Sequence, residues 1–120
     1  MAYEVEHTDE FEAWWNTLAE RELIEITAIV ELLEEKGPML PFPFSSGIKT
    51  SRHDHMRELR IQIGGEPYRV FYAFDPRRAA ILLIGGNKGG DDRFYDRFVL
   101  IADKLYDVHL CELAKEGLLK

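Results

Sequence analysis

The 120-residue sequence predicts an α+β fold, with helices packed on one side of a small antiparallel sheet in the order β-α-α-β-β-β-α. Three observations support this fold class. Residues 9–36 and 93–115 repeat apolar side chains at helical spacing. Residues 58–63 alternate apolar with polar side chains, which is the period of a half-buried strand. Two further apolar runs follow, each bounded by turn residues.

The N-terminal third predicts one short strand and two helices. Residues 3–7 alternate as a strand does, and Thr8 or Asp9 has the side chain of a helix N-cap. A second helix is expected from Glu20 to Lys36, ended by Gly37 and Pro38. The apolar sides of the two helices would be formed by Phe11, Trp14, Trp15, Leu18, Leu23, Ile26, Ile29, Val30 and Leu33.

The proline-rich residues 38–47 predict an ordered loop. Its Leu40, Phe42 and Phe44 are too apolar for a disordered linker, so we expect them to lie against the core. Residues 48–55 are polar and mixed, and they predict no regular element.

Three strands are expected next. Residues 58–63 and 68–74 flank Gly64-Gly65, a pair typical of a two-residue hairpin, and Asp75-Pro76 begins the following turn. Residues 79–84 are apolar throughout, which predicts a central strand covered on both faces. A glycine-rich loop over residues 85–90 then leads to the helix at 93–115, closed by Gly117.

The composition is that of an ordinary globular protein, with 46% hydrophobic and 31% charged residues, and residues 1–120 predict a single domain. No apolar run reaches the ~20 residues of a membrane span, and the N-terminus lacks a signal-peptide pattern. Cys111 is alone, so no internal disulfide is expected. These features predict a cytoplasmic protein with no membrane partner.

The charge is divided unevenly along the chain. The formal net charge is −7, but residues 1–46 sum to −9, residues 47–97 to +3 and residues 98–120 to −1. An acidic protein does not coat nucleic acid by bulk charge, whereas a local positive field still concentrates anions. The sequence therefore predicts a basic sheet beside acidic helices.

Two arginines would face each other on this sheet. If Gly64-Gly65 is a two-residue loop, Arg60 lies directly opposite Arg69. Like charges in this position are destabilising, so an anion bound between them is one interpretation. The alternative is that each arginine has its own partner, such as Glu58 or Glu66. In this register the helix-covered face would hold Leu59, Ile61, Tyr68 and Val70.

Lys88 follows the last strand in the glycine-flanked string GGNKGG, where backbone and ammonium can both approach a ligand. The string lacks the pattern of a nucleotide-binding P-loop, and an ordinary turn lysine is the alternative. Tyr72 and Tyr95 have the chemistry to stack on a base or to move a proton, although tyrosines in such positions are usually core residues.

No metal site is predicted. His53 and His55 have suitable spacing but lack a third ligand in sequence. Asp91 and Asp92 lie where a helix N-terminus favours carboxylates. Cys111 has no cationic neighbour to favour a thiolate, so a cysteine nucleophile is not predicted.

Several strings together resemble one known group of proteins. MRELR, YAFDPRRAAILL, the G-x-K loop and LYDVHL are similar to the phage-associated, HigB-type branch of the RelE/ParE toxin superfamily. The resemblance extends from the opening strand to about Leu113. It implies a RelE-like fold with a small curved sheet. It also implies the toxin of a type II toxin–antitoxin pair, a metal-independent endoribonuclease that cuts mRNA, typically on the ribosome, and inhibits translation.

The same resemblance implies the partners and the site. The partner would be a helix-turn-helix antitoxin, no cofactor is expected, and RNA would lie against the exposed sheet face. The family's basic positions fall on Arg60, Arg69 and, with an offset, Lys88, and its helix aromatic falls on Tyr95 or Phe94. Further RNA-binding residues are expected at Arg57, Lys49 and Arg93.

These residue types suit RNA cleavage, which needs a deprotonated 2′-OH, a neutralised phosphorane and a protonated 5′ oxygen. We expect Arg60 and Arg69 to bind phosphate, Lys88 to act as acid, base or stabilising charge, and Tyr95 to stack or transfer a proton. The acidic net charge departs from the strongly basic nucleases of this superfamily. A non-catalytic toxin that binds a protein such as gyrase, and an inactive phage-derived remnant that binds only its antitoxin, are therefore alternatives.

Overall fold

The structure of the chain is a computed structural model that describes residues 2–118. Its elements are, in chain order, β1 (Val5–His7), α1 (Asp9–Trp15), α2 (Glu20–Lys36), the 3₁₀ turn η1 (Gly37–Met39), β2 (Ser45–Gly47), β3 (Arg57–Ile63), β4 (Glu66–Phe74), β5 (Ala80–Asn87) and α3 (Phe94–Lys115). The predicted elements are all present, and their bounds differ by a few residues at most. β2 is additional, and it lies inside the predicted loop at 38–47.

The five strands form one sheet in the order β1-β5-β4-β3-β2. The pairs β2–β3, β3–β4 and β4–β5 are antiparallel, but β1 runs parallel to β5. The prediction of a wholly antiparallel sheet is therefore wrong at this edge. Because a long stretch of chain separates β1 from β5, no tight turn forces these strands to run in opposite directions.

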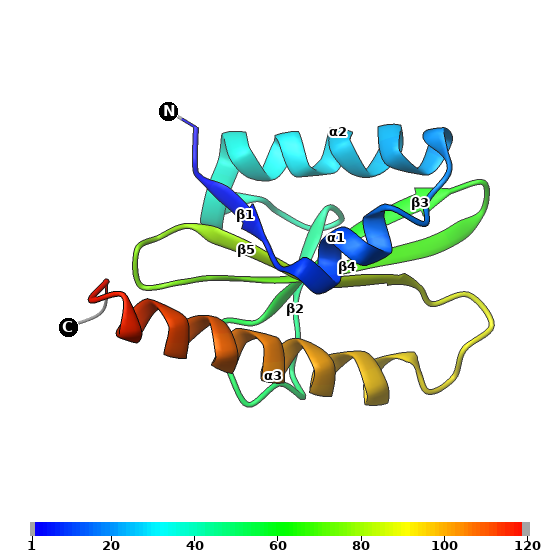
Figure 1. Cartoon of the computed structure of the whole chain (residues 1–120). Coiled ribbons are helices and arrows are strands. Elements are labelled where there is room, and N and C mark those ends of the chain that lie inside the picture. The colour runs from blue at the N-terminus through cyan, green and yellow to red at the C-terminus, as the bar shows by residue number, and fades with distance from the viewer. Residues whose placement is uncertain (1, 119–120) are drawn as a thin grey trace.

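The helices cover both faces of the sheet, so the prediction that they lie on one side is also wrong. Figure 1 shows α1 and α2 on one side of the sheet and α3 on the other. The reason is the apolar run of β4, because successive strand residues point to opposite faces. Val70 and Tyr72 contribute to the core on one side, whereas Phe71 and Ala73 contribute to the core beneath α3.

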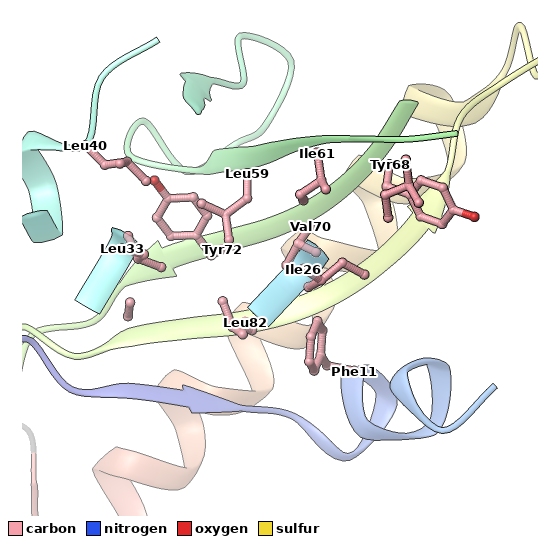
Figure 2. Close-up of a cluster of buried hydrophobic side chains, with 12 residues drawn as sticks. Phe11, Ile26, Leu33, Leu40, Leu59, Ile61, Tyr68, Val70, Tyr72 and Leu82 are labelled. Atoms are coloured by element: carbon pink, nitrogen blue, oxygen red, sulfur yellow. The ribbon is translucent and has the colours of Figure 1, made fainter. Parts of the chain in front are cut away.

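The core under α1 and α2 joins residues that lie far apart in sequence (Figure 2). Ile26 and Leu33 of α2 are fully buried against Leu59 and Val70 of the sheet. Phe11 packs into the same cluster from α1. The second core is built by the inner side of α3, with Phe94, Val99, Ala102 and Tyr106 packed against Phe71, Ala73, Ile81 and Leu83. β5 is covered on both faces, as predicted.

Local signals at the ends of elements are confirmed. Gly64 and Gly65 have φ angles of 58° and 83°, the positive values that a two-residue hairpin of this type requires. The Phe11 backbone N–H donates to Thr8 Oγ1 at 2.9 Å, so Thr8 is the N-cap of α1.

Gly85 brings β5 so close to α1 that a Cβ atom there would overlap the Trp14 ring. Between residues 2 and 118, no helix combines the length and apolarity needed to cross a membrane.

Candidate functional site

The facing arginine pair is confirmed by the register of the sheet. Arg60 of β3 pairs with Arg69 of β4, and Glu58 shares the same face because it lies two residues before Arg60. This face is turned toward α3. The site therefore lies between the sheet and the N-terminal end of that helix, from which Tyr95 reaches in.

An internal carboxylate lies where the sequence suggested a bound anion. The Glu58 carboxylate accepts hydrogen bonds from Ser46 Oγ at 2.8 Å and Tyr95 Oη at 2.7 Å. Its oxygens lie 3.5 Å from Arg69 Nε and 3.4 Å from Arg60 Nη1. The repulsion between the two arginines is thus offset by Glu58, a partner that the second interpretation of the sequence named, although the two arginines share it instead of each having its own.

The two arginine side chains differ in how accessible they are to a ligand. The Arg69 side chain is 6% exposed, and it also donates to the Tyr68 carbonyl at 2.9 Å and to Tyr95 Oη at 3.3 Å. Arg60 is 31% exposed, and its contact with Glu58 is long for a charge-assisted hydrogen bond. Arg60 can therefore meet a phosphate, whereas Arg69 is positioned to hold Glu58 and Tyr95.

Tyr95, in the first turn of α3, is the aromatic residue that enters this cluster. Its neighbour Phe94 is fully buried in the core and has no polar atom to offer. Burial raises the pKa of Tyr95, and the hydrogen bond to Glu58 raises it further. The phenol therefore stays protonated at neutral pH and acts as a donor to Glu58 rather than as a phenolate base.

Lys88 completes the cluster from the start of the loop that follows β5. Its Nζ lies over the Tyr95 ring, 5.8 Å from the centroid, which is within cation–π distance. The loop is held in place because the Lys88 backbone N–H donates to the Pro67 carbonyl at 2.9 Å. Three predicted residues, Arg60, Arg69 and Tyr95, are thus brought together around Glu58, and a fourth, Lys88, joins them through the Tyr95 ring.

A groove of about 320 Å³ begins beside Arg60. One wall is formed by Ala28 and Ile29 of α2, and the other by Pro43 and Phe44 of the loop before β2. Ile61 and Gln62 of β3 also line the groove, which therefore connects the arginine pair with this loop.

Three further residues predicted to bind RNA lie outside the cluster. The Arg57 Nε donates to Ser45 Oγ at 2.9 Å, and since Arg57 precedes Glu58 on β3 its side chain belongs to the opposite face. Lys49 is exposed on the loop after β2. Arg93 is exposed immediately before α3.

His53 and His55 each lie within hydrogen-bond distance of a residue of α3. His53 Nε2 lies 2.7 Å from an Asp107 oxygen, and His55 Nε2 lies 3.0 Å from Tyr106 Oη. Within residues 2–118, no three His, Cys, Asp or Glu side chains are grouped so that they could hold a metal ion.

A second buried carboxylate stabilises the turn between β4 and β5. Asp75 accepts hydrogen bonds from Arg77 Nη2 at 2.7 Å and from the Ala79 backbone N–H at 3.3 Å, and its Oδ2 lies 2.8 Å from His109 Nε2. Burial by itself would raise the pKa of Asp75, but the His109 and Arg77 contacts outweigh it and hold this pKa below its usual value.

Sequence reasoning missed the central position of Glu58 and the part played by Ser46. The signal for Glu58 was available, because strand alternation places residues 58 and 60 on one face. Ser46 gave no such signal, since it lies in a proline-rich stretch that did not predict a strand.

Comparison with known protein families identifies the family of this chain. The family described as phage-derived protein Gp49-like matches residues 13–107, which run from the end of α1 through most of α3. The chain belongs to the Gp49-like family. The resemblance that the sequence motifs indicated is thereby confirmed at the level of the family.

Two relatives of this Gp49-like chain come from Mycobacterium tuberculosis. A protein designated toxin HigB2 is 42% identical over 103 residues, which is 83% of this chain and 51% of that protein. One designated toxin HigB3 is 39% identical over 94 residues, 78% of this chain and 81% of that protein. The chain thus spans about half of the first relative and most of the second.

A solved structure shows the same fold. The crystal structure of the archaeal RelE–RelB complex from Pyrococcus horikoshii matches 75% of this chain and 99% of the solved chain, with a TM-score of 0.56 and 17% identity. The α+β fold is therefore RelE-like, as predicted.

Proposed function

We propose that this chain is the toxin of a type II toxin–antitoxin pair and that it inhibits translation by cutting mRNA. The observation that carries the proposal is the grouping of Arg60 and Tyr95 around the buried Glu58, with Lys88 over the Tyr95 ring. These are the residue types needed to bind a phosphate and to move protons at it. The toxin designations of the two M. tuberculosis relatives support the same function.

The reaction is a transesterification within the RNA. The 2′ oxygen attacks the adjacent phosphorus, the bond from phosphorus to the 5′ oxygen breaks, and the products are a 2′,3′-cyclic phosphate and a 5′-hydroxyl. One proton leaves the 2′-OH and one is delivered to the departing 5′ oxygen. A base, an acid and a positive charge beside the phosphorane are therefore needed.

The cluster offers a group for each task. Arg60 binds the phosphate because its guanidinium is partly exposed and only loosely held by Glu58. Tyr95 accepts the 2′-OH proton while it passes its own proton to Glu58, to which it already donates at 2.7 Å. Lys88 delivers a proton to the 5′ oxygen or stabilises its charge. Arg69 is a positioning residue, since it holds both Glu58 and Tyr95 from within the core.

The partners follow from this function. The mRNA would be engaged on the ribosome, in the cytoplasm, and a helix-turn-helix antitoxin would bind the chain to restrain it. That the RelE structure from P. horikoshii was solved as a complex with RelB supports a protein partner for this fold.

The test is induced expression of the chain in bacteria, with mapping of mRNA ends. We expect growth arrest and new mRNA ends from the wild type, and loss of both from Arg60→Ala and Lys88→Ala. Single substitutions are preferred to an Arg60/Arg69 double alanine variant, since removal of the buried Arg69 would also destabilise the fold. Lys104→Ala is the matched control, because it removes an exposed lysine of α3 outside the cluster.

Each result separates the candidate functions. Growth arrest without new mRNA ends would contradict the nuclease and support a toxin that binds a protein such as gyrase. No effect of the wild type on growth would instead support an inactive remnant that only binds an antitoxin.

A further inference from the structure

The loop before β2 presents an aromatic side chain that the fold does not use. Phe42 is 68% exposed, although the sequence predicted that it would lie against the core. That expectation is correct for Leu40, which is 2% exposed, and wrong for Phe42. A phenylalanine held mainly in water contributes little to stability, so the Phe42 ring is available to a ligand.

The loop around Phe42 is fixed at both ends. The buried Leu40 anchors one end in the core beneath α2. At the other end the Phe44 backbone N–H donates to the Pro41 carbonyl at 3.0 Å, and the Phe44 carbonyl accepts from the Arg60 backbone N–H at 2.9 Å. Phe42 is therefore presented on a fixed turn beside β3, and little order has to be gained when a ligand binds.

The surroundings of Phe42 favour an anionic, planar ligand. The Arg60 guanidinium lies over one face of the Phe42 ring, 5.0 Å from its centroid. Because two-thirds of Phe42 is exposed, its other face is open to solvent. Arg60 also lines the groove of about 320 Å³, whose walls include Phe44 and Ile29. A flat apolar surface thus lies directly beside a positive charge that has room for a phosphate.

We propose that Phe42 and this groove form a base-binding subsite for single-stranded RNA, in which a nucleobase stacks on the open face of Phe42 while its phosphate meets Arg60. The inference rests on the proposed nuclease function and adds to it a contact that orients the strand. Stacking on aromatic side chains is a general way to hold unpaired bases, and every base has a suitable face. A protein segment docked on Phe42 would bury its apolar ring but would have no need of the arginine beside it.

The experiment measures the affinity for a fluorescein-labelled ten-nucleotide single-stranded RNA, in which 2′-O-methyl groups prevent cleavage. Fluorescence anisotropy is recorded over a series of salt concentrations, and the variants are compared at the lowest one. We expect Phe42→Ala to weaken binding on the order of 10-fold, in the range of a lost base–aromatic stack. Phe42→Leu should weaken binding similarly, since it keeps an apolar side chain without a planar face. Phe42→Trp should retain the wild-type affinity or exceed it.

Met39→Ala is the matched control, because Met39 is 79% exposed, lies three residues away and has no planar ring. Its RNA affinity should equal that of the wild type. Arg60→Ala should reduce the salt dependence of binding, whereas Phe42→Ala should leave that dependence unchanged, since of these two side chains only that of Arg60 carries a charge that neutralises a phosphate.

Equal affinity of the wild type, Phe42→Ala and Phe42→Leu would overturn the subsite, and so would a loss of protein-partner binding in Phe42→Ala with RNA affinity intact. The nuclease proposal would survive either result as long as the wild type produces new mRNA ends. Failure of the wild type to bind the oligonucleotide would also overturn the subsite, and mapping of mRNA ends would then show whether the proposed function fails with it.

Discussion

Glu58 and Arg69 form a buried ion pair whose strength can be measured with a double-mutant cycle. Both side chains are about 5% exposed, and the pair is completed by hydrogen bonds from Ser46 and Tyr95 to the Glu58 carboxylate. The perturbations are Glu58→Gln, Arg69→Met and the two together. Each single substitution leaves one buried charge without its partner, whereas the double variant leaves none.

The expected loss in the free energy of unfolding follows from that difference. Removing one member of a buried pair destabilises a protein by roughly 3 to 5 kcal/mol, because the remaining charge stays out of water uncompensated. Arg60 still faces position 58 from 3.4 Å and is partly solvated, so we expect the lower end, about 3 kcal/mol for each single variant. This corresponds to a fall in Tm on the order of 10 °C. The double variant should lose less than the sum, with a coupling energy of about 2 kcal/mol.

The assay is equilibrium unfolding in urea, followed by tryptophan fluorescence and circular dichroism at pH 7. Glu35→Gln, which neutralises an exposed glutamate of α2, is the control, and it should change the free energy of unfolding by less than about 0.5 kcal/mol. Single variants as stable as this control, or a coupling energy near zero, would refute the conclusion that Glu58 holds the arginine pair together.

Three further predictions concern single groups. Tyr95→Phe keeps the ring but removes the hydroxyl that donates to Glu58. The rate of mRNA cleavage should therefore fall on the order of 100-fold or more, while the free energy of unfolding falls by only about 1 kcal/mol. Cleavage by this variant at the wild-type rate would contradict the proton relay. Because the pKa of Asp75 is lower in the folded chain than in an unfolded one, its contribution to stability should be complete above about pH 4 and be lost as the pH falls through the folded value. Urea unfolding across this range should therefore show a weaker pH dependence for Asp75→Asn, and an unchanged profile would contradict this role. Gly85→Ala should destabilise the fold by about 3 kcal/mol in the same assay, because the new methyl group overlaps Trp14, and a neutral effect would show that α1 can move away.

The parts of the fold that could be predicted are those determined by neighbouring residues. The Gly64-Gly65 turn sets the register of β3 and β4, and the opposition of Arg60 and Arg69 follows directly from that register. The helices were predictable because their caps and their apolar spacing agree.

The fold prediction was wrong where the structure of a segment depends on residues far away in the sequence. The direction of β1 depends on β5, more than 70 residues away, and nothing local to Val5 indicates it. β2 forms because Ser45 and Ser46 meet β3, although the proline-rich sequence around them is typical of a loop. The position of α3 on the second face of the sheet is different, because a local signal for it was present. Consecutive apolar residues in β4 indicate a strand that is buried on both faces.

The charge pattern of the site has a physical consequence for the proposed chemistry. One of the two interpretations of the sequence was an external anion between the arginines, but Glu58 already balances the buried Arg69. The positive charge left for a substrate is therefore carried by Arg60 and Lys88 at the edge of the cluster. Few phosphates can be neutralised in this way, so electrostatic attraction to RNA is limited in a chain of net charge −7. Contacts that do not depend on charge, such as the stacking proposed for Phe42, or a partner such as the ribosome, must then supply the remaining affinity.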